Sequence, residues 1–227
     1  MSELPKISKA GDELDIVTSR LAESLFSAYQ GLFVYEWVGT HVPALQELGV
    51  SGAFGYVQYM AQRQCALGLS ATYENNKHHK LGSVPGVIKV LSGYSPYIRK
   101  DFDKALKGLG LNDKAVNKII NLQDEDFKDG MWIGELNKVR PTSENNKIIQ
   151  SWKRFRDENV AHFDMEYEPK RLMPSLEQTE ELLDWAYRFH QMVCDFFISN
   201  VSGLDSKYWA KRHSAGPFNK LFKQLSS

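Results

Sequence analysis

Apolar residues recur at helical spacing along most of the chain, and few stretches show the strict alternation that is typical of a strand. The pattern therefore predicts an all-α fold. A first long helix is expected from Asp12, as its N-cap, to the aromatic run at 33–37, and a second over 53–74. The polar segment 75–86, which contains two glycines and a proline, is expected to be a loop. The shorter predicted elements lie at 43–48, 85–92, 96–108 and 112–122.

The C-terminal half is expected to contain two further long helices. The first covers about 143–163. The second opens at Ser175, where Gln178 stands at the capping-box position. Its expected end is 202–203, because glycine commonly follows the last turn of a helix.

The length of 227 residues suffices for a sizeable apolar core. Without a repeat or a linker, the predicted organisation is one helical domain over 1–203 and a short basic helical extension over 204–227. The two cysteines, Cys65 and Cys194, lack C-x-x-C spacing and are expected to be packing residues in a reducing compartment. No run approaches the roughly 18 apolar residues of a membrane span. We therefore expect a cytoplasmic protein that does not associate with a membrane.

The charges balance over the whole chain, with 28 basic and 28 acidic residues, so any site for a polyanion must be local. The acidic segment is 124–129. The basic segment near the C-terminus contains Lys207, Lys211, Arg212, Lys220 and Lys223. Solvated surface is the simplest interpretation of each.

The segment FRDENVAHFD at 155–164 holds an arginine and a histidine six positions apart near the end of a predicted helix. The spacing alone carries little information, because nine arginines, six histidines and three tolerated spacings give about 0.7 chance matches. The helical wheel is more informative. Arg156, Asn159 and His162 interrupt the apolar arc of this helix, and Arg154 falls on the opposite, polar arc.

An arginine inside an apolar arc loses hydration that only a partner can replace, so an anion or a carboxylate is expected to meet Arg156. The residues also allow a purely structural interpretation. In that interpretation Arg156 pairs with a carboxylate of another helix, His162 is a hydrogen-bonded core or boundary residue, and Asn159 bridges them.

The segment RDENVAHFD resembles the signature of the HEPN (higher eukaryotes and prokaryotes nucleotide-binding) superfamily, in its abortive-infection and toxin-like branch. The matching residues are Arg156, Asp157 and His162. The order of predicted helices is similar to that of the family over about 12–200, while only 152–164 is specific to the motif. The resemblance implies a HEPN-like antiparallel helical bundle with additional short helices.

The resemblance also implies a metal-independent endoribonuclease that works as a homodimer, with the 143–163 helices of two copies meeting across a two-fold axis. RNA is the implied substrate, and neither a metal nor another cofactor is expected. His162 would move a proton to or from the ribose 2′-hydroxyl or the leaving oxygen, and Arg156 would stabilise charge on phosphate. Asp157 is implied to orient the arginine. The wheel suggests that Asn159 hydrogen-bonds the substrate or the partner helix.

In HEPN toxins controlled by a partner nucleotidyltransferase, a tyrosine two positions after the histidine is the modification target, and this chain has Asp164 there. Regulation by that route is not expected, although an antitoxin or other regulatory partner and a role in antiviral defence stay open. The alternatives are a non-catalytic HEPN-like module that binds nucleotide, RNA or a protein partner, and a purely structural protein. Elsewhere, His78-His79 is expected in a solvated loop and His190 in a packed position.

Overall fold

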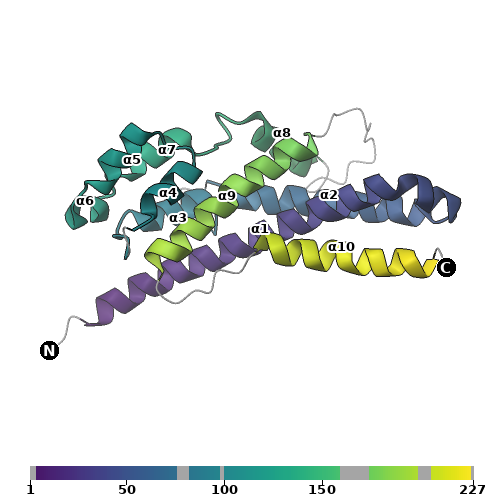
Figure 1. Cartoon of the computed structure of the whole chain (residues 1–227), viewed down its shortest axis with the longest axis horizontal. Helices are drawn as coiled ribbons and strands as arrows, with labels where there is room; N and C mark the ends of the chain where they lie inside the picture. The colour runs from purple at the N-terminus through teal and green to yellow at the C-terminus, as the bar shows by residue number, and fades with distance from the viewer. Residues whose placement is uncertain (1–3, 76–81, 98–99, 159–173, 199–205, 226–227) are drawn as a thin grey trace. The chain divides into compact units, whose positions relative to one another are not determined.

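The computed structural model of the chain describes residues 4–75, 82–97, 100–158, 174–198 and 206–225. Regular structure in these ranges consists of helices alone, which confirms the all-α prediction (Figure 1). The helices are α1 (Leu4–Glu47), α2 (Ser51–Tyr73), α3 (Val84–Leu91), α4 (Phe102–Gly108), α5 (Asp113–Ile120), α6 (Asp124–Lys128), α7 (Ile133–Val139), α8 (Lys147–Arg156), α9 (Leu176–Phe197) and α10 (Ser206–Leu225).

The chain divides into two compact units whose segments alternate along the sequence. The first unit comprises Met1–Ala22, Ala71–Thr142 and Asp184–Leu204, and the second comprises Glu23–Ser70, Ser143–Leu183 and Asp205–Ser227. The helices α1, α2 and α9 therefore contribute residues to both units. The predicted boundary between 1–203 and 204–227 falls among residues outside the described part, so that division stays a prediction.

In the second unit, α1 and α2 form an antiparallel helical hairpin. The turn between them is a Schellman motif: the Val50 N–H bonds the Leu45 carbonyl at 3.0 Å and the Gly49 N–H bonds the Gln46 carbonyl at 3.0 Å. Gly49 has a φ of 70°, a left-handed conformation that favours glycine. Leu45 and Val50 then meet in one apolar cluster, as this motif commonly provides.

Two glycines allow the hairpin helices to approach closely. A Cβ on Gly31 would lie 2.5 Å from the Ala61 carbonyl oxygen and 2.5 Å from the Cys65 amide nitrogen. A Cβ on Gly68 would lie 2.5 Å from the amide nitrogen of Ala28. These are main-chain atoms of the opposite helix, so α1 and α2 pack backbone against backbone at both positions.

The apolar cluster of the second unit includes a face of α10. The Phe218 ring of α10 stacks on Trp37 with centroids 5.2 Å apart, and the Trp37 indole donates to the Asn219 side-chain oxygen at 2.8 Å. Phe54 of α2 contacts both rings. The amphipathic C-terminal helix is thus fixed to the hairpin by both apolar and hydrogen-bonded contacts.

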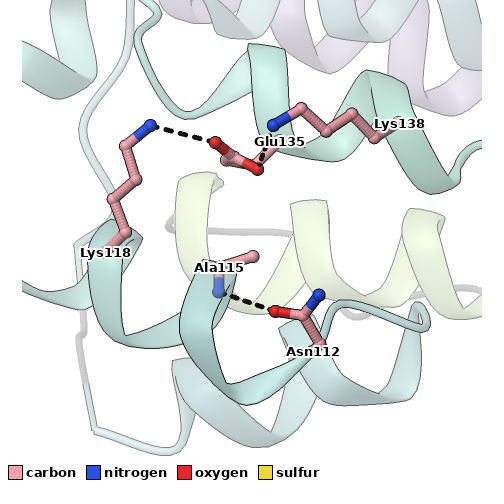
Figure 2. A network of polar contacts seen from close by, with 5 residues as sticks. All are labelled: Asn112, Ala115, Lys118, Glu135 and Lys138. Atoms are coloured by element: carbon pink, nitrogen blue, oxygen red, sulfur yellow. Dashed lines mark hydrogen bonds and ion pairs between the residues drawn. The ribbon is translucent and has the colours of Figure 1, made fainter.

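The first unit is built around aromatic rings brought in by short helices. Trp132 stacks on Phe197 of α9 with centroids 5.4 Å apart, and Phe102 of α4 lies 5.0 Å from Phe196. On its surface, Glu135 accepts hydrogen bonds from Lys118 and Lys138 (Figure 2). First Lys138 and then Lys118 lower the pKa of the Glu135 carboxyl through these bonds.

The sequence prediction was wrong about the extent of α1. The helix begins at Leu4, upstream of Asp12, and continues through Pro43 to Glu47, where a separate element was expected. A proline inside a helix costs about 3 kcal/mol. Val38 and Leu45, which lie on either side of it, are both buried in the apolar cluster and together contribute about 3–6 kcal/mol, which offsets that cost.

Other boundaries were predicted with mixed success. The helices α2, α3 and α5 lie where the sequence predicts them, whereas α4 begins only at Phe102 and the short helices α6 and α7 were not predicted. The long C-terminal helix α9 ends at Phe197, before the predicted 202–203, which lies outside the described residues. Its start is confirmed, because the Ser175 hydroxyl accepts from the Gln178 N–H at 3.1 Å.

Candidate functional site

The helix that carries the candidate residues is α8, and an asparagine determines where it starts. The Asn146 side-chain oxygen accepts from the N–H groups of Ile148 at 2.9 Å and Ile149 at 3.2 Å. These bonds satisfy amide groups that have no partner within the helix. The helix therefore begins at Lys147, later than the predicted Ser143.

One face of α8 is buried in the second unit, as the wheel predicts. Ile149, Trp152 and Phe155 are buried, and the two aromatic rings pack edge to face with centroids 5.9 Å apart. The Trp152 indole donates to the Thr179 hydroxyl of α9 at 3.0 Å. Since a buried indole N–H needs a partner, this bond fixes the rotation of α8 about its axis.

The rotation of α8 separates the two arginines near its end. The Arg156 side chain is 27% exposed, whereas that of Arg154 is 66% exposed and pairs with Glu158 at 2.9 Å. This difference confirms that Arg156 lies toward the apolar arc and that Arg154 faces solvent. A pair as exposed as Arg154 and Glu158 contributes little to stability.

A carboxylate meets Arg156, as expected, but it belongs to the next residue in the chain. The Oδ1 atom of Asp157 accepts from Nε at 2.8 Å and contacts Nη2 at 2.7 Å. Asp157 is 58% exposed, which agrees with its solvent-facing position on the wheel. Its carboxylate nevertheless reaches the guanidinium of Arg156. A guanidinium has five N–H donors. Asp157 engages two of them along one side, and within the described ranges no partner is recorded for the donors on Nη1.

Two of the four predicted site residues, Asn159 and His162, lie outside the described residues, as does the loop pair His78-His79. Their position relative to Arg156 therefore stays a prediction. Asp157 and the residue after it adopt a π-helical turn. Such turns are rare and occur frequently at functional sites.

A cavity of about 270 Å³ lies beside Trp152 in the second unit. Its walls include Leu32, Tyr35, Gln62, Cys65, Trp152 and Leu176. Burial raises the pKa of the Cys65 thiol to about 12, so this group stays neutral and unreactive. The sequence did not reveal this cavity, because its residues come from four separate segments and form no local pattern.

The histidine of α9 is a packed residue, which confirms the prediction for His190. Its side chain is 2% exposed, and burial lowers its pKa to about 4, so the ring is neutral near pH 7. The Cys194 sulfur lies 3.6 Å from its Nε2 atom. Burial raises the pKa of the Cys194 thiol to about 12, and both cysteines are packing residues as predicted.

Comparisons with known proteins identify no relative of the chain, since protein-family models, curated proteins and solved structures give no match. Among the residues that the structure describes, no three or more His, Cys, Asp or Glu side chains are grouped so that they could hold a metal ion. No helix in the same ranges has the length and apolar character needed to cross a membrane.

Proposed function

We propose that the chain is a metal-independent endoribonuclease of the HEPN type, with Arg156 and His162 as its catalytic pair. The observation that carries the proposal is the state of Arg156. Its side chain is 27% exposed at the end of an amphipathic helix, and its guanidinium is held along one side by Asp157, which leaves the Nη1 side to meet an incoming anion in this proposal. The neighbouring Arg154 has no comparable environment, because it is exposed and paired with Glu158.

The chemistry needs only the substrate and these side chains. The ribose 2′-oxygen attacks the adjacent phosphorus, the bond to the 5′-oxygen breaks, and the products are a 2′,3′-cyclic phosphate and a 5′-hydroxyl. The proton leaves the 2′-hydroxyl and another is delivered to the 5′-oxygen, which is the role proposed for His162. Arg156 presents a planar fork to the phosphate oxygens as negative charge builds on them.

Asp157 and Asn159 have supporting roles in this proposal. A carboxylate bound to Nε and Nη2 limits rotation of the guanidinium, so Asp157 orients the arginine toward the phosphate. A fixed donor costs no reorganisation when the transition-state charge appears. Asn159 hydrogen-bonds the RNA or the partner helix.

The proposal includes a homodimer formed through 143–163, since one copy offers a single arginine and a single histidine of the motif. Two copies related by a two-fold axis bring both pairs into one composite site. An antitoxin or other regulatory partner, and a role in antiviral defence, belong to the same proposal.

The test is RNA cleavage in excess EDTA, with product analysis for 2′,3′-cyclic phosphate ends. We expect His162→Ala and Arg156→Ala to lower the cleavage rate by about 100-fold or more, the usual contribution of such groups. Arg154→Ala is the matched control and should retain the wild-type rate, because its side chain is exposed and its ion pair is weak.

Two results would contradict the proposal: cutting by His162→Ala at the wild-type rate, or equal losses for Arg154→Ala and Arg156→Ala. A second candidate is a non-catalytic module that binds nucleotide or RNA. The cavity beside Trp152 favours it, because about 270 Å³ suits a group no larger than a nucleobase and Gln62 offers an amide to it. Wild-type protein that binds RNA without cutting it supports this second function.

A further inference from the structure

The C-terminal helix α10 concentrates positive charge in a chain whose charges otherwise balance. Its basic residues are Lys207, Lys211, Arg212, Lys220 and Lys223, and it has no aspartate or glutamate between Ser206 and Leu225. Lys207 is paired with Glu180 of α9 at 3.0 Å. The others lie on exposed positions of the helix.

The inner face of α10 is occupied by the hairpin of the second unit. Ala210 and Ser214 are buried, and the Ser214 hydroxyl donates to the Ala210 carbonyl at 2.6 Å. One turn further along, Phe218 stacks on Trp37. Ala210, Ser214 and Phe218 are thus covered, although Leu221 is 41% exposed, and the outer face is the one that carries the cations.

The outer face combines aromatic rings with cations. Stepping 100° per residue places Tyr208, Trp209, Arg212, His213, Lys220 and Lys223 on one arc of about 140°. Tyr208 is 53% exposed and Trp209 is 38% exposed. Along the helix axis this arc extends for about 22 Å.

The rings on this arc are held in order by contacts among themselves. Trp209 stacks on His213 with centroids 5.5 Å apart and planes 19° from parallel. The Arg212 guanidinium lies 5.4 Å over the Trp209 ring, and Tyr208 meets the same ring edge to face at 5.7 Å. Arg212 and His213 therefore limit the motion of the indole, which stays 38% exposed.

We infer that this outer face of α10 is a docking surface for single-stranded RNA, with Tyr208 and Trp209 stacking on bases and Arg212, Lys220 and Lys223 contacting phosphates. Charge complementarity selects a polyanion, and exposed planar rings select one whose bases are free to stack. The bases of a duplex are already stacked on each other and do not offer these faces. A membrane helix would need its apolar face free, but here Phe218 is packed on the hairpin.

This inference deepens the proposed function, because it names the surface that holds the RNA which Arg156 and His162 would cut. The experiment separates the two by using RNA that cannot react. A fluorescein-labelled single strand of about 20 nucleotides with 2′-O-methyl groups keeps the bases and phosphates. It lacks the attacking 2′-hydroxyl, so fluorescence anisotropy measures binding independently of cleavage.

We expect Tyr208→Ala and Trp209→Ala to weaken binding by about tenfold each, because each substitution removes one stacking platform. A triple variant with Arg212, Lys220 and Lys223 changed to glutamine should lower the slope of log affinity against log salt by about 2, or roughly 0.7 for each lost phosphate contact.

The matched controls are in the first unit. Tyr97→Ala removes a ring that is 67% exposed, and Lys114→Gln removes an exposed cation, so both should bind like wild type. Circular dichroism melts confirm that each variant is folded, and Tyr208→Ala, at the more exposed position, keeps the test decisive if Trp209→Ala loses stability.

Three results overturn the inference: unchanged binding by Tyr208→Ala and Trp209→Ala, equal binding of a 2′-O-methyl duplex by wild type, or binding of phosphatidylserine vesicles in place of the single strand. If the wild-type protein cleaves unmodified RNA and the α10 variants bind RNA normally, the proposed function is supported and this surface is not. If Trp209→Ala weakens RNA binding but the wild-type protein cleaves no RNA, this surface is supported and the proposed function is not.

Discussion

The close approach of α1 and α2 gives a prediction in which the same substitution has opposite effects at two positions. Alanine at Gly31 would place Cβ 2.5 Å from two main-chain atoms of α2, whereas carbon atoms normally pack at about 3.5–4.0 Å. The helices must separate by about 1 Å, since neither clashing atom belongs to a flexible side chain. Overpacking of this kind costs about 1–3 kcal/mol. Better helix propensity returns about 0.5–1 kcal/mol, so the free energy of unfolding should fall by about 1 kcal/mol.

The matched control is Gly55→Ala in α2. A Cβ at Gly55 meets nothing within 4 Å, so only the propensity gain remains and the free energy of unfolding should rise by about 0.5–1 kcal/mol. Gly68→Ala should behave like Gly31→Ala, because its Cβ would lie 2.5 Å from the amide nitrogen of Ala28. The propensity gain is common to both classes of variant, so they should differ by the overpacking cost alone, about 2 kcal/mol.

Urea unfolding followed by circular dichroism measures the three free energies, and thermal melts provide a second readout. For a chain of this size, about 1 kcal/mol corresponds to a melting temperature lower by about 2–4 °C. A Gly31→Ala protein as stable as Gly55→Ala would refute the reasoning. It would mean that α1 and α2 are not in backbone contact at this point, and that the antiparallel hairpin of the second unit is wrong.

Two further predictions concern buried titratable groups. The pKa of His190 is lowered in the folded chain to about 4, so its contribution to stability is present above about pH 6.5 and is lost as pH falls toward 4. Between pH 7 and pH 4.5 wild type should lose about 2–3 kcal/mol more than His190→Gln in urea unfolding, and equal losses would contradict this. The Cys65 and Cys194 thiols, with pKa values raised to about 12, should react with Ellman's reagent only after unfolding, and rapid reaction of the native protein would show that they are accessible.

Periodicity in the sequence was enough to predict the helical class and the buried face of α8. The wheel distinguished Arg156 from Arg154 because both the helix period and the apolar residues around them are local information. The Ser175 cap was predictable for the same reason, since a serine followed three residues later by glutamine is a local signal.

Features that depend on distant contacts could not be predicted in this way. The continuation of α1 past Pro43 depends on burial of Leu45 against α2, which no local pattern contains. An anion or a carboxylate was expected to meet Arg156, and only the structural alternative took it from another helix. The wheel places Asp157 on the solvent face and does not reveal that its carboxylate can reach the neighbouring arginine, a contact that only the family resemblance implied. The cavity beside Trp152 combines four segments, so it required the fold itself.

The balanced total charge of the chain conceals two different local arrangements, and this difference bears on where a polyanion would bind. In the first unit, Lys118 and Lys138 share Glu135, and Lys107 lies 3.0 Å from Asp113, so these cations have carboxylates beside them (Figure 2). A phosphate would have to compete with those carboxylates. The helix α10 has no acidic residue of its own, and Arg212, Lys220 and Lys223 share an arc with exposed rings. An RNA strand on this arc therefore meets no carboxylate of α10 itself, and its binding should depend on that helix although the net charge of the protein is zero.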